Sequence, residues 1–413
     1  MKTTTLLFTF FIFASQMGFA IDRIVADGGA GGAYATITEA IDAASTNDRI
    51  IIYPKAGGVP YGENLTITNK SLQLLSAVEG QRWTLNGNIN FNPTIVGQTL
   101  TIIEANVLNG NIATSGNAPA GNRAKVRILE CKLQNGSILF DYNNYDMNIS
   151  RDSLLNGRVI MRYGKITGNY VNYNATSGSV ITVNTDNSAS NDSLYIVGNK
   201  IGYTGFYYYE YTAGITWNST SQFAYIANNL IESSASGYYG SYGVFISTNA
   251  TSATGKNVVL NNTITCTGGQ YAIYIQAHNS YNAIYNNAIT STTGIYSNAL
   301  STFDLVSYNH LTQSVVSSAL TNILQDGTNV VGATFTYNSN GQILTGSPIN
   351  GGYPDAAYYD LDLSINDAGC FGGSYSRANF IGNSAGAVAS FMTAPRRVLA
   401  GQSITIQGEG YDK

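Results

Sequence analysis

Charged side chains are scarce in this sequence. Asp, Glu, Lys and Arg together make up 11% of its 413 residues, against about 25% in an average soluble domain. The net charge is −4 and no cluster of Lys or Arg occurs, so the basic footprint of a nucleic-acid-binding protein is missing. Intrinsic disorder is also excluded, because disordered chains are poor in aromatic residues, whereas this chain has 30 Tyr and 15 Phe.

Cysteine and histidine are equally rare. The three cysteines, Cys131, Cys266 and Cys370, fit neither a metal motif nor a disulfide framework by their spacing. We expect them to be small, buried hydrophobic residues. The two histidines, His278 and His310, follow a strand and an Asn bend, and we interpret both as surface residues.

Long hydrophobic runs are missing except near the amino terminus. Lys2 precedes an apolar stretch over 6–14, and a small-residue cleavage site ends at Ala20. Residues 1–20 are therefore predicted to be a secretory signal peptide. A membrane span needs roughly eighteen or more apolar residues, so no transmembrane segment is expected. We expect the mature chain to begin near Ile21 and to be secreted or located at the extracellular cell surface.

One short phrase recurs through the middle of the chain. It consists of an apolar strand, an Asn and a second apolar strand, as in Tyr195-Ile-Val-Gly-Asn-Lys-Ile201. Its Asn recurs at Asn169, Asn199, Asn229, Asn262, Asn287 and Asn309, and degenerate copies place Asp152 and Cys131 there. A fixed phrase at variable intervals is typical of a β-solenoid, whose coils return to the same strands while their loops vary. Helical repeats are excluded because Gly and β-branched residues dominate.

The recurring Asn is predicted to form one bend per coil. Asn tolerates left-handed backbone angles, and Asn side chains stacked at the strand repeat can bond to one another. The fold class is therefore all-β, a right-handed parallel β-helix over 48–376 with coils of about twenty to thirty residues. In this register Cys131 and Cys266 lie five coils apart. They cannot form a disulfide, which needs Cα atoms within roughly 7 Å.

A second phrase follows each bend, and strand alternation assigns its two faces. The predicted inward rows are Ile181, Ile215, Val244, Ile273 and Ile295, then Val183, Trp217, Ile246 and Ile275. The predicted outward rows are Thr182, Thr216, Phe245, Tyr274 and Tyr296, then Asn184, Asn218, Ser247, Gln276 and Asn298.

Different segments are expected at the two ends of the solenoid. Residues 21–47 form an N-terminal cap, with a helix over 36–44 that starts in a capping box from Thr36 to Glu39. Residues 377–413 are interpreted as a linker and the start of a truncated immunoglobulin-like or PKD-like module. Two strands alone would be marginally stable, so this piece either lies against the helix end or belongs to a longer protein. We favour the longer protein.

The opening and closing motifs resemble those of a known superfamily. The segment from Tyr34 to Pro54 is similar to the start of secreted pectin-lyase-like β-helix proteins of Bacteroidetes type. Ser347-Pro-Ile-Asn-Gly351 and the segment from Asp360 to Gly369 resemble their closing motif. The resemblance covers residues 22–376 and implies the fold. It implies an activity only as a class, because one fold hosts many functions.

Pectin-lyase-like proteins include lyases, glycoside hydrolases and esterases, and each activity needs a characteristic set of residues. Glycoside hydrolysis usually takes two carboxylates, but no Asp-Asp pair occurs, and Asn184-Thr-Asp186 matches a hydrolase signature without its partners. A lyase would imply calcium, held by clustered oxygen ligands; otherwise no cofactor or metal is expected. The central acids do not occupy matching places on successive coils, and they are Asp186, Asp192, Glu210 and Glu232.

Aromatic residues form the strongest candidate site. The loop after Asn199 and the loop after Asn229 leave the stack at the same corner, so we predict that their tyrosines flank a groove beside the outward aromatic row. Tyr offers a flat apolar face and a polar tip, which suit stacking on a sugar. The candidate ligand-binding residues are Tyr203, Tyr207, Tyr208, Tyr209, Tyr211, Tyr238, Tyr239, Tyr242, Phe245, Tyr274 and Tyr296. Glu210 is the candidate catalytic residue.

Three functions remain open. The first is a secreted or cell-surface protein that binds polysaccharide through this aromatic groove, and it is the one we favour. The second is a polysaccharide lyase or glycoside hydrolase, and the third is a structural or adhesive stalk in which the tyrosines only pack. A polysaccharide is the expected partner, nucleic acid is not, and the protein is expected to be a monomer.

Overall fold

The structure is a computed structural model, and it describes most of the chain. The described residues are 20–174, 178–187, 193–207, 212–220, 222–234, 236–237, 241–247, 256–268, 271–276, 282–297, 304–313, 315–317, 323–325, 327–382, 386–394, 401 and 403–411. All of the predicted signal peptide except Ala20 lies outside them. In this part of the chain, no helix has the length and the apolar character needed to cross a membrane.

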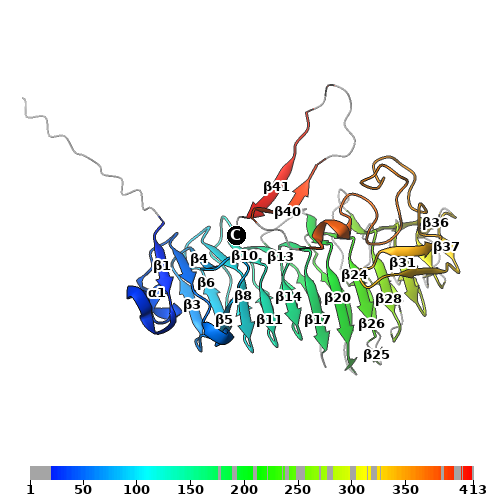
Figure 1. Ribbon diagram of the computed structural model, residues 1–413. Helices are drawn as coiled ribbons and strands as arrows, with labels where there is room; N and C mark the ends of the chain where they lie inside the picture. The colour runs from blue at the N-terminus through cyan, green and yellow to red at the C-terminus, as the bar shows by residue number, and fades with distance from the viewer. Residues whose placement is uncertain are drawn as a thin grey trace, which may run out of the picture.

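The chain winds into a right-handed parallel β-helix, as predicted (Figure 1). Each full coil contributes one strand to each of three long sheets, which we name A, B and C in the order in which a coil visits them. Neighbouring strands within each sheet are parallel and come from successive coils.

Sheet A contains β1 (Asp22–Val25), β2 (Arg49–Ile52), β4 (Leu72–Ser76), β7 (Thr99–Ile103), β10 (Ala124–Leu129), β13 (Tyr145–Ser150), β16 (Gly164–Thr167), β19 (Ser193–Val197), β23 (Phe223–Ala227), β27 (Asn257–Leu260), β30 (Asn282–Tyr285), β33 (Asp304–Ser307) and β36 (Ile323–Gln325). Sheet B contains β5 (Trp83–Asn86), β8 (Ala105–Leu108), β11 (Lys132–Gln134), β14 (Ser153–Leu155), β17 (Tyr170–Asn174), β20 (Lys200–Thr204), β24 (Leu230–Ser233), β28 (Thr263–Cys266), β31 (Ala288–Ser291), β34 (His310–Leu311) and β37 (Val330–Val331). Sheet C contains β3 (Leu65–Thr68), β6 (Ile89–Asn92), β9 (Ile112–Ala113), β12 (Ile138–Phe140), β15 (Val159–Met161), β18 (Ile181–Asn184), β22 (Thr212–Asn218), β26 (Ser241–Ile246), β29 (Tyr271–Ile275), β32 (Ile295–Ser297) and β35 (Val315–Ser317).

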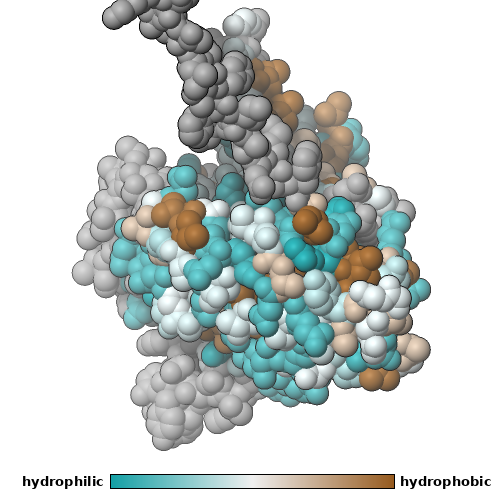
Figure 2. Space-filling view, turned by 90° about the vertical axis from the view of Figure 1, so that its left-hand side faces the viewer, coloured by the Kyte–Doolittle hydropathy of each residue, from teal (hydrophilic) through white to brown (hydrophobic). Residues whose placement is uncertain are grey.

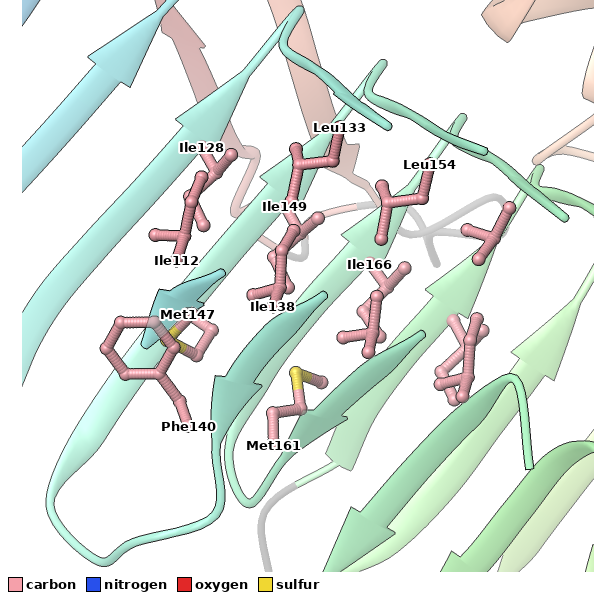
Figure 3. Close-up of a cluster of buried hydrophobic side chains, with 14 of the residues drawn as sticks. Ile112, Ile128, Leu133, Ile138, Phe140, Met147, Ile149, Leu154, Met161 and Ile166 are labelled. Carbon is pink, nitrogen blue, oxygen red and sulfur yellow. The ribbon is translucent and has the colours of Figure 1, made fainter. Parts of the chain in front are cut away.

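The hydrophobic core fills the interior of the coil. Alternate residues of every sheet point inward, and rows of Ile, Leu, Val, Met and Phe stack from one coil to the next (Figure 3). Both inward rows predicted for sheet C are fully buried, from Ile181 to Ile295 and from Val183 to Ile275. Strand alternation therefore assigned the faces of sheet C correctly.

A buried ladder of Asn side chains forms the bend between sheets A and B. Asn169 donates from Nδ2 to Oδ1 of Asn199 over 3.0 Å, and the same bond continues coil by coil to Asn309. Asp152 and Cys131 occupy the same place, because Cys131 N–H donates to Asp152 Oδ1 and Asp152 N–H donates to Asn169 Oδ1. The predicted alignment of one Asn per coil is confirmed.

The backbone reason that we gave for this Asn is wrong, however. The left-handed residue is the one before it, as at Gly198 (φ 71°) and Asn228 (φ 55°), while the ladder Asn residues do not have positive φ. The ladder position is occupied by Asn because a buried amide can accept and donate along the stack. All three cysteines are buried and free. Strand β11, which directly follows Cys131, is separated by five strand steps in sheet B from β28, which contains Cys266.

The N-terminal cap has the predicted helix. Helix α1 (Ile37–Ala43) starts in a capping box in which Glu39 N–H donates to Thr36 Oγ1. Its buried face consists of Ile37, Ala40 and Ile41, which cover the first coils. Figure 2 shows the N-terminal end of the β-helix, where the surface is mainly hydrophilic with a few separate hydrophobic patches. The cap thus shields the open end of the stack, which would otherwise expose unpaired strand edges.

The C-terminal part differs from a simple continuation of the coils to residue 376. The described parallel strands end at β37, and an antiparallel hairpin follows, formed by β38 (Phe335–Tyr337) and β39 (Ile343–Gly346). Residues 347–382, here called the C-terminal strap, then run back along the bend between sheets A and B. Asn261 Nδ2 donates to Asn366 Oδ1 over 2.9 Å, and the ring of Phe380 lies over Gly198.

A second antiparallel hairpin ends the described chain. It pairs β40 (Val388–Thr393) with β41 (Gln407–Tyr411), and it projects from the helix with one end near β10 and β13 of sheet A (Figure 1). Glu409 forms an ion pair with Lys165, and Asn148 Nδ2 donates to Glu409 Oε2 over 2.8 Å. The segment thus contacts the flank of the helix. Its assignment to an immunoglobulin-like or PKD-like module stays a prediction.

Candidate functional site

The structure separates the predicted tyrosines into three groups. Tyr203 is the first, because it points into the core from β20 and is fully buried. Its inclusion among the ligand-binding residues is therefore corrected. Counting alternation from Asn199 places Lys200 and Gly202 outward and Ile201 and Tyr203 inward, so the sequence already contained this signal.

The second group is the aromatic row on sheet C. Phe245, Tyr274 and Tyr296 lie on adjacent strands in one register, as predicted. Phe245 stacks on Tyr274 with ring centroids 5.3 Å apart, and Tyr271 stacks on Tyr296 at 4.4 Å. Because the rings turn their faces toward one another, the faces of Phe245 and Tyr274 are not free for a sugar, and both side chains are buried.

Tyr242 belongs to this row as well. It is 1% exposed, and its ring stacks on Tyr271 at a centroid distance of 6.0 Å. These contacts favour packing for Tyr242, Phe245 and Tyr274, while Tyr296 remains partly exposed. The row therefore forms a packed aromatic cluster on the outer face of sheet C.

The third group lies in the two loops between sheets B and C. Strand β21 (Phe206–Tyr207) pairs with β25 (Ser236–Gly237) in parallel, so the two loops run side by side where they leave the stack. Tyr208, Tyr209, Glu210, Tyr211, Tyr238 and Tyr239 lie outside the described residues.

A groove of about 290 Å³, lined mostly by polar residues, lies next to the start of these loops on the outer face of sheet B. Its floor is a row of side chains in register on four successive strands, namely Asn172, Gly202, Glu232 and Thr265. Gly202 has no side chain, so it leaves a gap between Asn172 and Glu232. The hollow runs along the helix axis, which is the direction that an extended chain of sugars would take.

The groove is bounded on two sides. Toward sheet A, the hairpin β38–β39 contacts it: Tyr337 Oη lies 2.7 Å from Thr265 Oγ1, and Lys200 Nζ donates to Ser339 O over 2.8 Å. Toward sheet C, Thr204 and Ser234 line the groove directly before β21 and β25 begin. The groove thus lies between a C-terminal hairpin and the tyrosine-rich loops.

One ion pair lies in the lining of the groove. Lys200 Nζ lies 3.5 Å from Glu232 Oε2, and both side chains are partly exposed. Burial raises the pKa of Tyr337, and the negative charge of Glu232 adds to this rise. Hydroxyl groups of Thr204, Ser234, Thr265 and Thr267 complete the lining. This set can exchange hydrogen bonds with sugar hydroxyls.

The other titratable candidates lie elsewhere. Asp186 is fully buried and forms an ion pair with Arg123 over 3.4 Å. Asp192 and His278 lie outside the described residues. Among the described residues, no group of three or more His, Cys, Asp or Glu side chains is placed to hold a metal ion.

His310 is not a surface residue, contrary to our interpretation. It points away from the core, as alternation predicted, but the C-terminal strap covers it and leaves it 2% exposed. Its ring nitrogens lie 2.9 Å from Ser347 Oγ and 3.0 Å from Gly351 O. Burial lowers the pKa of His310, which suits a structural role beneath the strap.

Sequence reasoning missed Lys200 and Gly202 and named Glu232 only as an isolated acid. Alternation from the Asn bend places all three outward, but their grouping depends on the register between coils and on the hairpin β38–β39. No protein-family model matches the chain, and no curated protein matches it. The protein is therefore assigned by its fold alone, which is a right-handed parallel β-helix.

Proposed function

We propose that this protein binds polysaccharide in the groove on the outer face of sheet B. The observation that carries the proposal is the row Asn172, Gly202, Glu232 and Thr265, which forms a polar hollow along the helix axis. Ligand sites are concave and hold a small number of well-placed polar groups, and this groove meets both conditions. The tyrosines of the two adjacent loops would supply stacking faces.

The proposal also includes the location, the family resemblance and the monomeric state that the sequence predicts. The amino-terminal residues support export, so the protein would meet its ligand outside the cytoplasm, either secreted or at the cell surface. The opening and closing motifs support a place among pectin-lyase-like proteins of Bacteroidetes type. A monomer is sufficient for the proposed function, because one chain forms the whole groove.

A second candidate function is hydrolysis or elimination in the same groove. The specific observation in its favour is the Lys200–Glu232 pair, because it places an ammonium group and a carboxylate within one polar hollow. Such a pair could supply an acid and a base. The stalk alternative gains support from the stacked row on sheet C, but it does not account for the groove.

A glycan array combined with an ultraviolet assay for unsaturated uronides tests these alternatives together. We expect binding to extended polysaccharides and no absorbance from new double bonds. Replacing Tyr208 and Tyr239 by Ala should weaken binding and leave the melting temperature nearly unchanged. Binding that is unaffected, together with a large loss of stability, would assign these rings to packing and contradict the proposal.

A further inference from the structure

We infer that the groove accepts a neutral polysaccharide and discriminates against chains of uronic acids. This inference rests on the proposed function and narrows it to a substrate class. It concerns the charge of the ligand, which the side chains in and around the groove determine.

The only cationic side chain in the described lining of the groove is Lys200, and its charge is already engaged. Its Nζ lies 3.5 Å from Glu232 Oε2 and donates to Ser339 O over 2.8 Å. A uronate carboxylate entering the groove would have to compete with Glu232 for the same ammonium group. It would also lie beside the Glu232 carboxylate, and like charges at short range repel.

The flanking loops add no positive charge. In sequence, the segments 204–212 and 234–241 contain no Lys, Arg or His, and their one acid, Glu210, lies outside the described residues. Behind the groove, Arg377 is 8% exposed and its NH1 donates to Asn340 O over 3.2 Å. Burial lowers its pKa, and its guanidinium is enclosed by protein. The described lining of the groove therefore offers no free cation that could pair with a chain of carboxylates.

The lining suits neutral sugars instead. Hydroxyl and amide groups from Asn172, Ser234, Thr265 and Thr267 can each donate and accept hydrogen bonds. Elimination in a polysaccharide requires a carboxyl group that acidifies the neighbouring C–H bond, so a groove that excludes uronates also argues against a lyase. The inference thus favours binding, or hydrolysis of a neutral chain, at this site.

The test compares neutral and anionic probes on the full chain. Affinity gel electrophoresis would use arabinoxylan and mannan as neutral probes, and polygalacturonate and alginate as uronate probes, at low and high salt. We expect at least one neutral probe to bind with a Kd that salt changes by less than about twofold, because no net charge is neutralised. The uronate probes should bind at least about tenfold more weakly, the size expected for one unpaired charge.

Two variants make the result specific to the groove. Glu232→Gln releases Lys200, so uronate binding should strengthen by about two- to fivefold at low salt, the scale of a partly exposed charge pair. Lys132→Ala is the control. Lys132 occupies the same outward row of sheet B as Lys200, three coils earlier, so this variant should leave the binding of every probe unchanged. Salt-sensitive binding of uronates above neutral probes would overturn this inference and leave the proposed function intact. Binding to neither class would remove the proposed function itself.

Discussion

Asn229 and Asn262 are joined by a hydrogen bond of 3.0 Å from Nδ2 to Oδ1, with both side chains fully buried on successive coils. Asn229 also accepts at Oδ1 from the backbone N–H and the Nδ2 of Asn199. Each ladder amide thus satisfies groups on both neighbouring coils. Buried polar groups are costly unless they are paired, so the ladder works as a unit.

Asn229→Ala should therefore destabilise the helix strongly. The change removes the acceptor of two Asn199 donors, and it removes the Nδ2 donor that Ile196 O and Asn262 Oδ1 receive. We therefore expect the free energy of unfolding to fall by about 2–4 kcal/mol. Asn218→Ala is the control, because its bond to Asn184 is partly exposed and water can replace it at a cost below about 1 kcal/mol. Urea unfolding monitored by circular dichroism measures both, and equal losses would contradict the role of the ladder.

Asp152 is the acid of the ladder, and replacing it by Asn should stabilise the protein. Asp152 Oδ1 accepts from Cys131 N–H, as the Oδ1 of a ladder Asn would. Asp152 Oδ2 then lies where a ladder Asn has its Nδ2 donor, and this oxygen has no hydrogen-bond partner. Burial raises the pKa of Asp152 well above its ordinary value. Asp152→Asn restores a donor, and we expect a gain of about 1–3 kcal/mol at neutral pH.

The same residue predicts a pH dependence. Because the folded-state pKa lies above the unfolded value of about 3.9, the folded state binds the proton more tightly. Its contribution to stability is complete below the unfolded pKa and is lost as the pH rises toward the folded pKa. Melting temperatures measured from pH 4 upward should fall in the wild type more steeply than in Asp152→Asn. Parallel curves would show that Asp152 is not held as a neutral acid.

The C-terminal strap depends on a glycine at the bend. A Cβ at Gly198 would lie 2.2 Å from Cδ2 of Phe380, and Gly198 has a φ of 71°. Gly198→Ala should release this end of the strap and make residues 377–382 exchange amide hydrogens faster. Gly332→Ala is the matched control, since its φ is 74° and nothing lies near the added Cβ. Both variants have the backbone strain of a left-handed Ala, so a change common to both would reflect strain alone.

The ladder and the core were predictable because both depend on local rules. The phrase around Asn199 repeats, and alternation then places Ile215 inward and Phe245 outward without any knowledge of the loops. Tyr203 was misassigned against this same local rule, and the left-handed residue lies one position before the Asn to which it was assigned. The other failures depend on distant chain segments. His310 points outward as expected, but the strap covers it. Gly202 is unremarkable as one residue and becomes the centre of a groove only when Asn172 and Glu232 come into register beside the hairpin β38–β39.

The most direct test of polysaccharide binding in this groove is to place a side chain at Gly202, where the floor of the groove has none. The φ of Gly202 lies outside the left-handed region, and the atoms nearest to an added Cβ belong to Asn172, at 3.5 Å or more. Gly202→Thr should therefore fold normally and gain up to about 1 kcal/mol, because Gly weakens a strand. Leu155→Thr places the same side chain in the same outward row two coils earlier, beside Asn172 but outside the lining of the groove.

Calorimetric titration of the wild type and these two variants with a neutral oligosaccharide identified by the array gives the decisive comparison. We predict that Gly202→Thr lowers affinity by at least about tenfold, equivalent to about 1.4 kcal/mol, and that Leu155→Thr matches the wild type. Unchanged affinity in a fully folded Gly202→Thr protein would contradict binding in this groove.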